Sequence, residues 1–401
     1  MRIFYAAAAS PNYWGLPESK LWHVNLYLPL ADLGHELVTF DYDYGPHNNH
    51  LDPRVPAQRE FMLRNRPRLG EELLRQVKAA HGRRPIELFF SYFYSAYVDP
   101  GVIREIGRMG IPMVNWYCNA SYQFDLVSEI APAYDFCLVP EKFRLDDYRR
   151  VGANPIYCQE AANPNVYRPM DVPVEFDVTF VGQRYGNRPM YLRRLIEAGV
   201  DVRAWGPRWD EQAWKARSKA DEELARRTTG PLSDDELVAM YSRSRISLGF
   251  SAVAHAPSGG SSPIKQVRLR DFEAPMSGAF YLVERFDELA EFFEPGKEIV
   301  FFEDEEDLAE KGVYYLRHES ERQRIREAGL RRAREQHTWH RRFEIAFRAM
   351  GLKPYSLSPV RRGEGRGEGL AVETKHAPHP NPLPRVRGRG DEEAEAARCA
   401  A

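Results

Sequence analysis

The sequence has few cysteines and no long apolar run, and these two absences exclude several classes of protein. Its 401 residues include only Cys118, Cys137, Cys158 and Cys399, which lie far apart without a Cys-x-x-Cys pair or clustered histidines. This distribution argues against a disulfide framework and a zinc site, and it fits a reducing compartment. No apolar run approaches the roughly 18 residues of a membrane-spanning helix. We therefore expect a cytoplasmic protein without a transmembrane segment, and peripheral contact with a membrane stays open.

A large net charge is also lacking. The formal net charge is −2, so there is no electrostatic reason to expect nucleic acid as a partner. Hydrophobic residues make up 43% of the chain and charged residues 28%, which is typical of a globular protein with a substantial core. At this length two core-forming domains are the default expectation.

Predicted strands and helices alternate along the chain. The apolar run at 2–9 favours a buried strand over a weak signal peptide, because it is short and polar residues follow it. A helix over 20–33, a glycine stop and a strand over 37–40 come next. The alternation continues to a proline-rich stretch at 163–173 and restarts with a strand over 176–182. This pattern predicts an α/β protein of two tandem, doubly wound Rossmann-like domains.

The predicted domains are an N-terminal one over residues 1–168 and a C-terminal one over 174–350, followed by a tail over 353–401. The tail is rich in glycine, proline and charge and has almost nothing to bury, so it is predicted to be disordered. A basic nucleic-acid-binding tail is the alternative, which the acidic residues among its arginines disfavour. We assign the tail no function.

A glycine- and serine-rich loop at 257–262 precedes a stretch that the spacing predicts to be a helix from residue 264, ended by Gly278. Loop, helix N-terminus and following strand form the half-unit from which phosphate-binding α/β domains are built. Gly259, Gly260 and Ser261 are therefore phosphate-loop candidates, with an ordinary flexible loop as the alternative.

Charged residues follow on this predicted helix. At helical spacing Lys265 and Arg268 share a face, whereas Arg270 points elsewhere and is expected to form a structural ion pair. Glu273, further along, is placed to accept hydrogen bonds from sugar hydroxyls. An ordinary surface helix with a charged face is the alternative.

Several segments resemble a known family. Phe176-Asp177-Val178-Thr179-Phe180-Val181-Gly182 and the residues to 209, the run from Arg268 to Gly278, Glu294–Glu298 and His337–Trp339 resemble the CgeB-like branch of the group 1 glycosyltransferases. Gly34-His35-Glu36 is similar to a segment in the first domain of many such enzymes. The likeness is dense over 176–350, looser over 1–170, and absent from the tail.

This resemblance implies a GT-B architecture. A nucleotide-sugar donor is then held mainly by the C-terminal domain and the acceptor by the N-terminal one, and a final helix over Arg341–Met350 crosses back onto the first domain. The family pattern has two glutamates eight residues apart. Glu273 matches the second, which is expected to hold the donor ribose. Lys265 stands in place of the first and is a candidate phosphate contact.

The chemistry of sugar transfer adds further candidates. A departing nucleoside diphosphate needs fixed cations or helix N-termini to stabilise its charge. Arg184 and Arg188 match positions at which the family places such cations, and with Lys265 they are the catalytic candidates. Gly182 would let the backbone approach the donor. Solvated loop arginines and an ordinary turn glycine are the alternatives.

The acceptor side is less defined. Asn119, at the end of a predicted strand, suits hydrogen bonds to an acceptor. His23 is a candidate base if the reaction inverts configuration, as are Asp41 and Asp43, although a structural histidine is the stronger interpretation. The Asp41-Tyr42-Asp43 run ends a strand and does not demand a metal. We expect no metal or other cofactor.

The sequence thus predicts a metal-independent glycosyltransferase that moves a sugar from a nucleotide-activated donor to a polysaccharide, glycolipid or other acceptor. One alternative is a non-catalytic, glycosyltransferase-like protein that binds glycans or assembles a surface layer. Another is a nucleotide-sugar epimerase on the same twin-domain fold.

Overall fold

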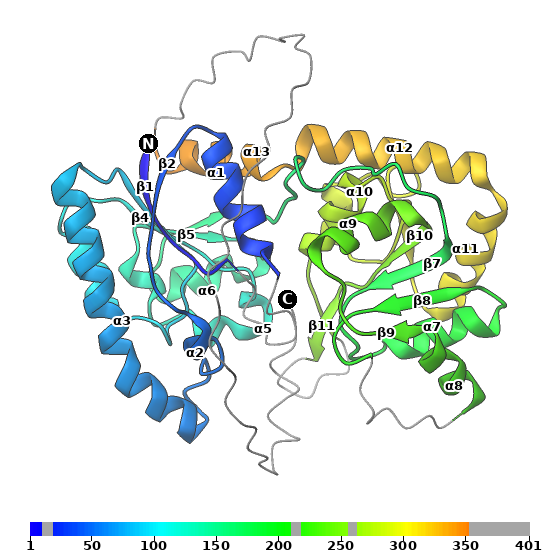
Figure 1. Ribbon diagram of the computed structural model, residues 1–401, viewed down its shortest axis with the longest axis horizontal. Helices are drawn as coiled ribbons and strands as arrows, with labels where there is room; N and C mark the ends of the chain where they lie inside the picture. Colours follow the sequence, from blue (N-terminus) through cyan, green and yellow to red (C-terminus); the bar gives the residue numbers. More distant parts are fainter. Residues whose placement is uncertain (10–18, 210–217, 256–262, 353–401) are drawn as a thin grey trace, which may run out of the picture.

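The structure is a computed structural model that describes residues 1–9, 19–209, 218–255 and 263–352. The candidates Gly259, Gly260 and Ser261 and the predicted tail lie outside the described residues. Two parallel six-stranded sheets lie side by side, each with helices on its faces (Figure 1). The predicted pair of doubly wound α/β domains is confirmed. No helix within the described ranges is long and apolar enough to cross a bilayer.

The first sheet has the strand order β2-β1-β3-β4-β5-β6 and is parallel throughout. Its central strands are completely buried, because helices cover both faces and every side chain must pack. The strands are β1 (Arg2–Ala6), β2 (Glu36–Thr39), β3 (Leu88–Ser91), β4 (Met113–Trp116), β5 (Phe136–Val139) and β6 (Pro155–Tyr157). The helices are η1 (His23–Tyr27, a π-helix), α1 (Leu28–Asp32), α2 (Gly45–Asn48), α3 (Pro56–Arg83), α4 (Pro100–Gly107), α5 (Ala120–Gln123) and α6 (Leu145–Arg150), with short 3-10 turns η2 (Phe124–Leu126), η3 (Ala131–Ala133) and η4 (Lys142–Arg144).

The second sheet has the order β14-β13-β10-β7-β8-β9. Numbered within its own domain this is the 3-2-1-4-5-6 order of dinucleotide-binding folds, and its direction reverses between β7 and β10. In such sheets the crevice at the reversal point, at the carboxyl ends of the strands, is where ligands bind. The strands are β7 (Phe176–Val181), β8 (Val202–Trp205), β9 (Thr228–Thr229), β10 (Ser244–Gly249), β13 (Tyr281–Glu284) and β14 (Val300–Phe302), and the helices are α7 (Arg188–Glu197), α8 (Lys219–Arg226), α9 (Asp234–Arg243), η5 (Asp287–Glu291), α11 (Glu305–Arg317) and α12 (Glu319–Gln336).

The segment predicted to be helical from residue 264 begins instead as a strand. β11 (Ala252–His255) and β12 (Pro263–Lys265) pair as an antiparallel hairpin, and α10 (Leu269–Met276) follows. The Asp271 carboxylate accepts a hydrogen bond from the backbone N–H of Arg268 at 2.8 Å, which fixes Arg268 as the N-cap. The prediction of a helix at Lys265 was wrong because the three-residue strand β12 is defined by its pairing with β11 and is too short to show a periodic pattern of its own.

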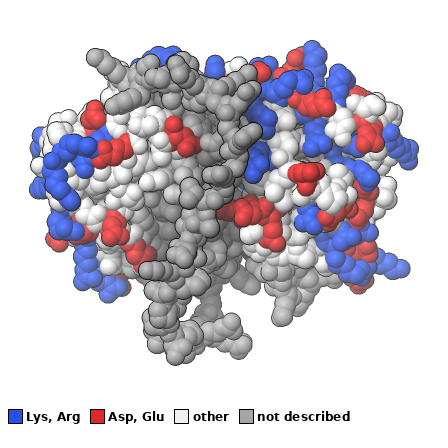
Figure 2. Space-filling view, turned by 45° about the horizontal axis from the view of Figure 1, so that its top comes forward, with Lys and Arg blue, Asp and Glu red and all other residues white. Residues whose placement is uncertain are grey.

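The chain returns to the first domain at its last helix. Thr338 pairs with Ala162, and α13 (Trp339–Ala349) then packs into the core of the first sheet. The Trp339 ring lies 5.3 Å from that of Trp116, and the Phe343 ring 5.9 Å from that of Phe90. The expected crossing of the final helix onto the first domain is confirmed. Figure 2 shows basic and acidic side chains interspersed over both domains on the visible face.

Candidate functional site

A pocket lies between the two domains, at the carboxyl ends of strands from both sheets. From the first domain it is lined by Trp22 near the start of η1, Asn119 after β4 and Glu160 after β6. From the second domain it is lined by Gly182, Gln183, Gly206, Arg268, Arg270 and Glu273. The pocket therefore lies at the carboxyl end of β7, one of the two strands that flank the reversal point of the second sheet, where ligands bind in such folds.

Backbone forms one wall of the pocket. Gly182 follows β7, and its carbonyl oxygen accepts a hydrogen bond from the indole of Trp209 at 2.7 Å. Gly206 follows β8 with φ +139°, and a Cβ there would lie 2.4 Å from the Gly182 carbonyl oxygen. Only glycine fits at Gly206. The sequence pointed to Gly182, whereas the role of Gly206 depends on this contact across the sheet.

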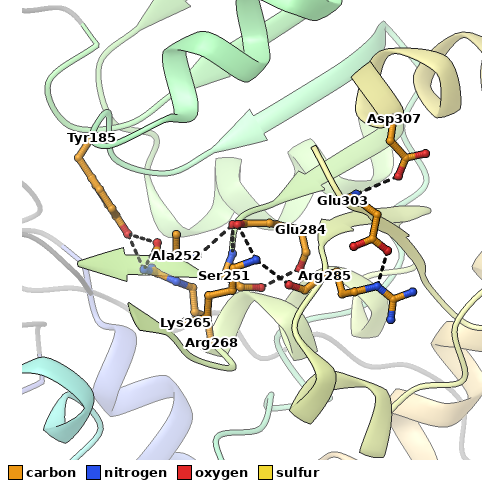
Figure 3. Close-up of polar contacts among 9 residues, drawn as sticks. All are labelled: Tyr185, Ser251, Ala252, Lys265, Arg268, Glu284, Arg285, Glu303 and Asp307. Atoms are coloured by element: carbon orange, nitrogen blue, oxygen red, sulfur yellow. Dashed lines mark hydrogen bonds and ion pairs between the residues drawn. The ribbon is translucent and has the colours of Figure 1, made fainter. Parts of the chain in front are cut away.

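Two arginines at the start of α10 line the pocket. The Arg268 guanidinium also donates to the Tyr185 hydroxyl and, at 3.3 Å, to the Ala252 carbonyl, so its position is fixed (Figure 3). The Nε atoms of both Arg268 and Arg270 are buried and have no hydrogen-bond partner within the described ranges. The expectation that Arg270 points away in a structural ion pair fails, because α10 starts five residues later than predicted.

Lys265 does not line the pocket. Its ammonium lies 2.9 Å from the Glu284 carboxylate and donates to the Arg285 carbonyl at 2.9 Å (Figure 3). The other Glu284 oxygen accepts from the backbone N–H groups of Ser251 and Ala252, at 3.0 and 3.1 Å. Lys265 thus holds the β11–β12 hairpin against the end of β13, and its charge is compensated there.

Arg184 and Arg188 stand beside the pocket and do not line it. The buried Arg188 side chain donates to the Gln183 carbonyl and the Tyr185 hydroxyl, both at 2.7 Å, and lies 3.8 Å from the centre of the Tyr185 ring. Burial lowers the pKa of Arg188 to about 9. In this position Arg188 supports the loop that carries Gln183. Arg184 donates its backbone N–H to the Pro207 carbonyl at 3.0 Å.

Glu273 lines the pocket from α10 and is 3% exposed. One of its carboxylate oxygens is buried and accepts no hydrogen bond from any described residue. Burial raises the pKa of Glu273 to about 7, against the opposing effects of the Tyr167 hydroxyl and the Arg270 charge. A buried oxygen without a partner in a lined pocket is placed to accept a hydrogen bond from a ligand.

Of the two acceptor-side candidates, the structure brings only Asn119 into the pocket. His23 stacks on Tyr27, with ring centres 4.7 Å apart, and burial together with the charge of Lys20 lowers its pKa. Asp43 accepts from the backbone N–H of Gly45 at 2.9 Å and so stabilises a turn. No three histidine, cysteine, aspartate or glutamate side chains of the described segments are grouped so as to hold a metal ion.

Part of the chain matches a known family. Residues 188–347 match a family model described as glycosyl transferase-like, and no curated protein matches the sequence. Sucrose-phosphate synthase from Thermosynechococcus elongatus superposes on 88% of this chain and 99% of its own, with 12% identity and a TM-score of 0.56. Anabaena HepE, in a structure with UDP and glucose, covers 88% of this chain and 100% of its own, with 13% identity and a TM-score of 0.55.

The fold is that of the GT-B glycosyltransferases. A glycosyltransferase from Rickettsia africae has it as well, with 11% identity, a TM-score of 0.55, and coverage of 87% of this chain and 97% of its own. In this GT-B protein the two domains also touch around the pocket. Asp234 of α9 accepts from the Ser19 hydroxyl at 2.8 Å and from the backbone N–H of Lys20 at 2.7 Å.

Proposed function

We propose that this protein is a glycosyltransferase that moves a sugar from a nucleotide-activated donor to the hydroxyl of a glycan or lipid acceptor. The observation that carries this proposal is the pocket between the domains, where Arg268, Arg270 and Glu273 meet at the start of one helix. The acceptor oxygen forms a bond to the anomeric carbon while the bond to the diphosphate breaks. The products are a glycoside, a nucleoside diphosphate and a proton.

Each of these groups has a role that its chemistry fits. Arg268 and Arg270 offset the charge that develops on the departing diphosphate, and they do so from a buried site in which electrostatic interactions are strong. The free Glu273 oxygen accepts hydrogen bonds from the ribose hydroxyls of the donor. Two fixed guanidinium groups supply the positive charge that a metal supplies elsewhere, which supports a metal-independent reaction.

The first domain faces the donor across the pocket, so the acceptor is expected to enter on the side of Trp22 and Asn119. Assignment to the CgeB-like branch rests on the segments quoted from the sequence. HepE is described in complex with UDP and with UDP-glucose, so uracil nucleotides are the first donors to test.

The test is an isothermal titration of UDP, GDP, CDP and dTDP into the wild type and into Glu273→Ala. Hydrogen bonds to a charged group contribute about 1.5 to 3 kcal/mol, so the variant should bind its nucleotide about 10- to 150-fold more weakly. Glu197→Ala, an exposed site on α7, is the control and should bind as the wild type does. Equal affinity in wild type and Glu273→Ala would contradict the site. Failure of every nucleotide to bind would favour the non-catalytic alternative.

A further inference from the structure

Three carboxylates line the pocket, and two already have a partner or a role. Asp234 is hydrogen-bonded to Ser19 and Lys20 of the first domain, and Glu273 is assigned to the ribose. The third is Glu160, which follows β6 and faces the second domain from the first. No sequence motif marks Glu160, because it is a single glutamate after a short strand.

The backbone around Glu160 is held rigidly. Its N–H donates to the side-chain carbonyl of Gln159 at 2.9 Å, and the amide of that glutamine donates to the Pro140 carbonyl at 3.1 Å. The Arg342 guanidinium of α13 donates to the Gln159 carbonyl at 3.1 Å. Contacts with two other segments of the chain therefore fix the backbone that carries the Glu160 side chain, which is 5% exposed and lines the pocket. Rigid positioning of this kind is what selective recognition of a ligand requires.

The surroundings of Glu160 disfavour its charged form. Burial raises its pKa well above the ordinary value, and the nearby carboxyl groups of Glu141, Glu273 and Asp271 raise it further, against the effect of Arg268. The Cys118 thiol, which also faces Glu160, is itself kept protonated by burial. An uncharged carboxyl group has one O–H donor and a carbonyl acceptor. It can exchange hydrogen bonds with a sugar hydroxyl, and it does not repel a diphosphate.

We propose that Glu160 recognises the sugar of the donor from the first-domain side of the pocket, by exchanging hydrogen bonds with sugar hydroxyls. This inference rests on the proposed function and assigns the sugar end of its donor site. The nucleotide end is held by the second domain. Loss of Glu160 should therefore weaken binding of a nucleotide sugar and leave binding of the bare nucleoside diphosphate unchanged.

The test compares UDP-glucose with UDP, or GDP-mannose with GDP where the guanine nucleotide binds, in wild type, Glu160→Gln and Glu160→Leu. Glutamine keeps one donor and one acceptor without charge, whereas leucine keeps the volume and removes both. Glu160→Leu should lose about tenfold in affinity for the nucleotide sugar and nothing for the diphosphate. Glu160→Gln should stay within about threefold of the wild type in its affinity for both ligands.

Glu141→Gln is the matched control, since Glu141 is a buried carboxyl group beside Glu160 that does not line the pocket. The ratio of its affinity for the nucleotide sugar to its affinity for the nucleoside diphosphate should equal the wild-type ratio. An unchanged ratio in Glu160→Leu would overturn the proposal, and loss of transfer in Glu160→Gln with donor affinity intact would show a proton-transfer role instead. Both outcomes leave the proposed function standing. If the wild type bound no nucleotide at all, both the role of Glu160 and the proposed function would be contradicted.

Discussion

Arg270 and Lys265 should differ in what they contribute to donor binding, because only the first of them lines the pocket. Both are cations near the start of α10, and the sequence favoured Lys265 as the phosphate contact and Arg270 as a structural residue. The structure places Arg270 in the pocket and Lys265 against Glu284, outside it. We predict that Arg270→Ala weakens binding of a nucleoside diphosphate, whereas Lys265→Gln does not.

The size of the effect follows from where the Arg270 charge lies. Two unit charges 4 Å apart interact by about 4 kcal/mol at an effective dielectric constant of about 20, which is an upper bound because water solvates the diphosphate before it binds. Hydrogen bonds to charged groups contribute about 1.5 to 3 kcal/mol net. The dissociation constant of Arg270→Ala should therefore rise about 10- to 150-fold. The Lys265 ammonium is already compensated by Glu284, so its loss should change the constant less than threefold.

The assay is isothermal titration of the nucleotide that the wild type binds, at pH 7 and fixed ionic strength, with the melting temperature of each variant as a check on folding. Glutamine at 265 still donates a hydrogen bond to Glu284, so this variant should remain folded. An equal loss of affinity in both variants, or a loss confined to Lys265→Gln, would refute the placement of the two cations.

Two further predictions concern stability. Trp339→Ala should lower the free energy of unfolding, measured by urea denaturation, by about 3 to 5 kcal/mol, because the Trp339 ring is buried in the core of the first domain. The control Ile345→Ala, at a residue of α13 that is 49% exposed, should change this free energy by no more than about 0.5 kcal/mol. Similar values for the two variants would contradict the crossing of α13 onto the first domain. Burial raises the pKa of Glu141 to about 8 and that of Glu273 to about 7. Between pH 5 and 8 the folded chain therefore holds protons on these groups that the unfolded chain has released. Because of these two groups, the free energy of unfolding falls as the pH rises through this range. Replacing either by glutamine should flatten the pH dependence of unfolding relative to the wild type, and parallel curves would show that these groups do not titrate in the window.

Much of the fold was predictable because its signal is local. Apolar runs such as 136–139 and amphipathic helices such as 305–317 follow from burial on one or both faces of an element. The capping box at the start of α9, formed by Ser233 and Glu236, is equally local, because it needs only a serine with a glutamate three residues later. The hairpin at Lys265 was missed, since β12 is defined by pairing with β11 and not by its own sequence.

The site was predictable only in part. Gly182, Asn119 and Glu273 were singled out and lie together in one pocket, whereas Arg184, Arg188, Lys265 and His23 were singled out and do not line it. Whether a side chain near the crevice points into it or away from it depends on the exact residue at which its helix starts. An error of five residues in the start of α10 exchanged the roles of Lys265 and Arg270.

The sequence by itself determined the class of this protein: two α/β domains, a crevice at their strand ends and a nearly neutral surface charge, because periodicity and composition act within single elements. Only the tertiary structure decided which charged groups meet in the crevice. Glu160 and Glu273 are 113 residues apart in the chain, and they line one pocket because two sheets and a returning helix bring them there. Burial then raises the pKa of each carboxyl group, which no local pattern records.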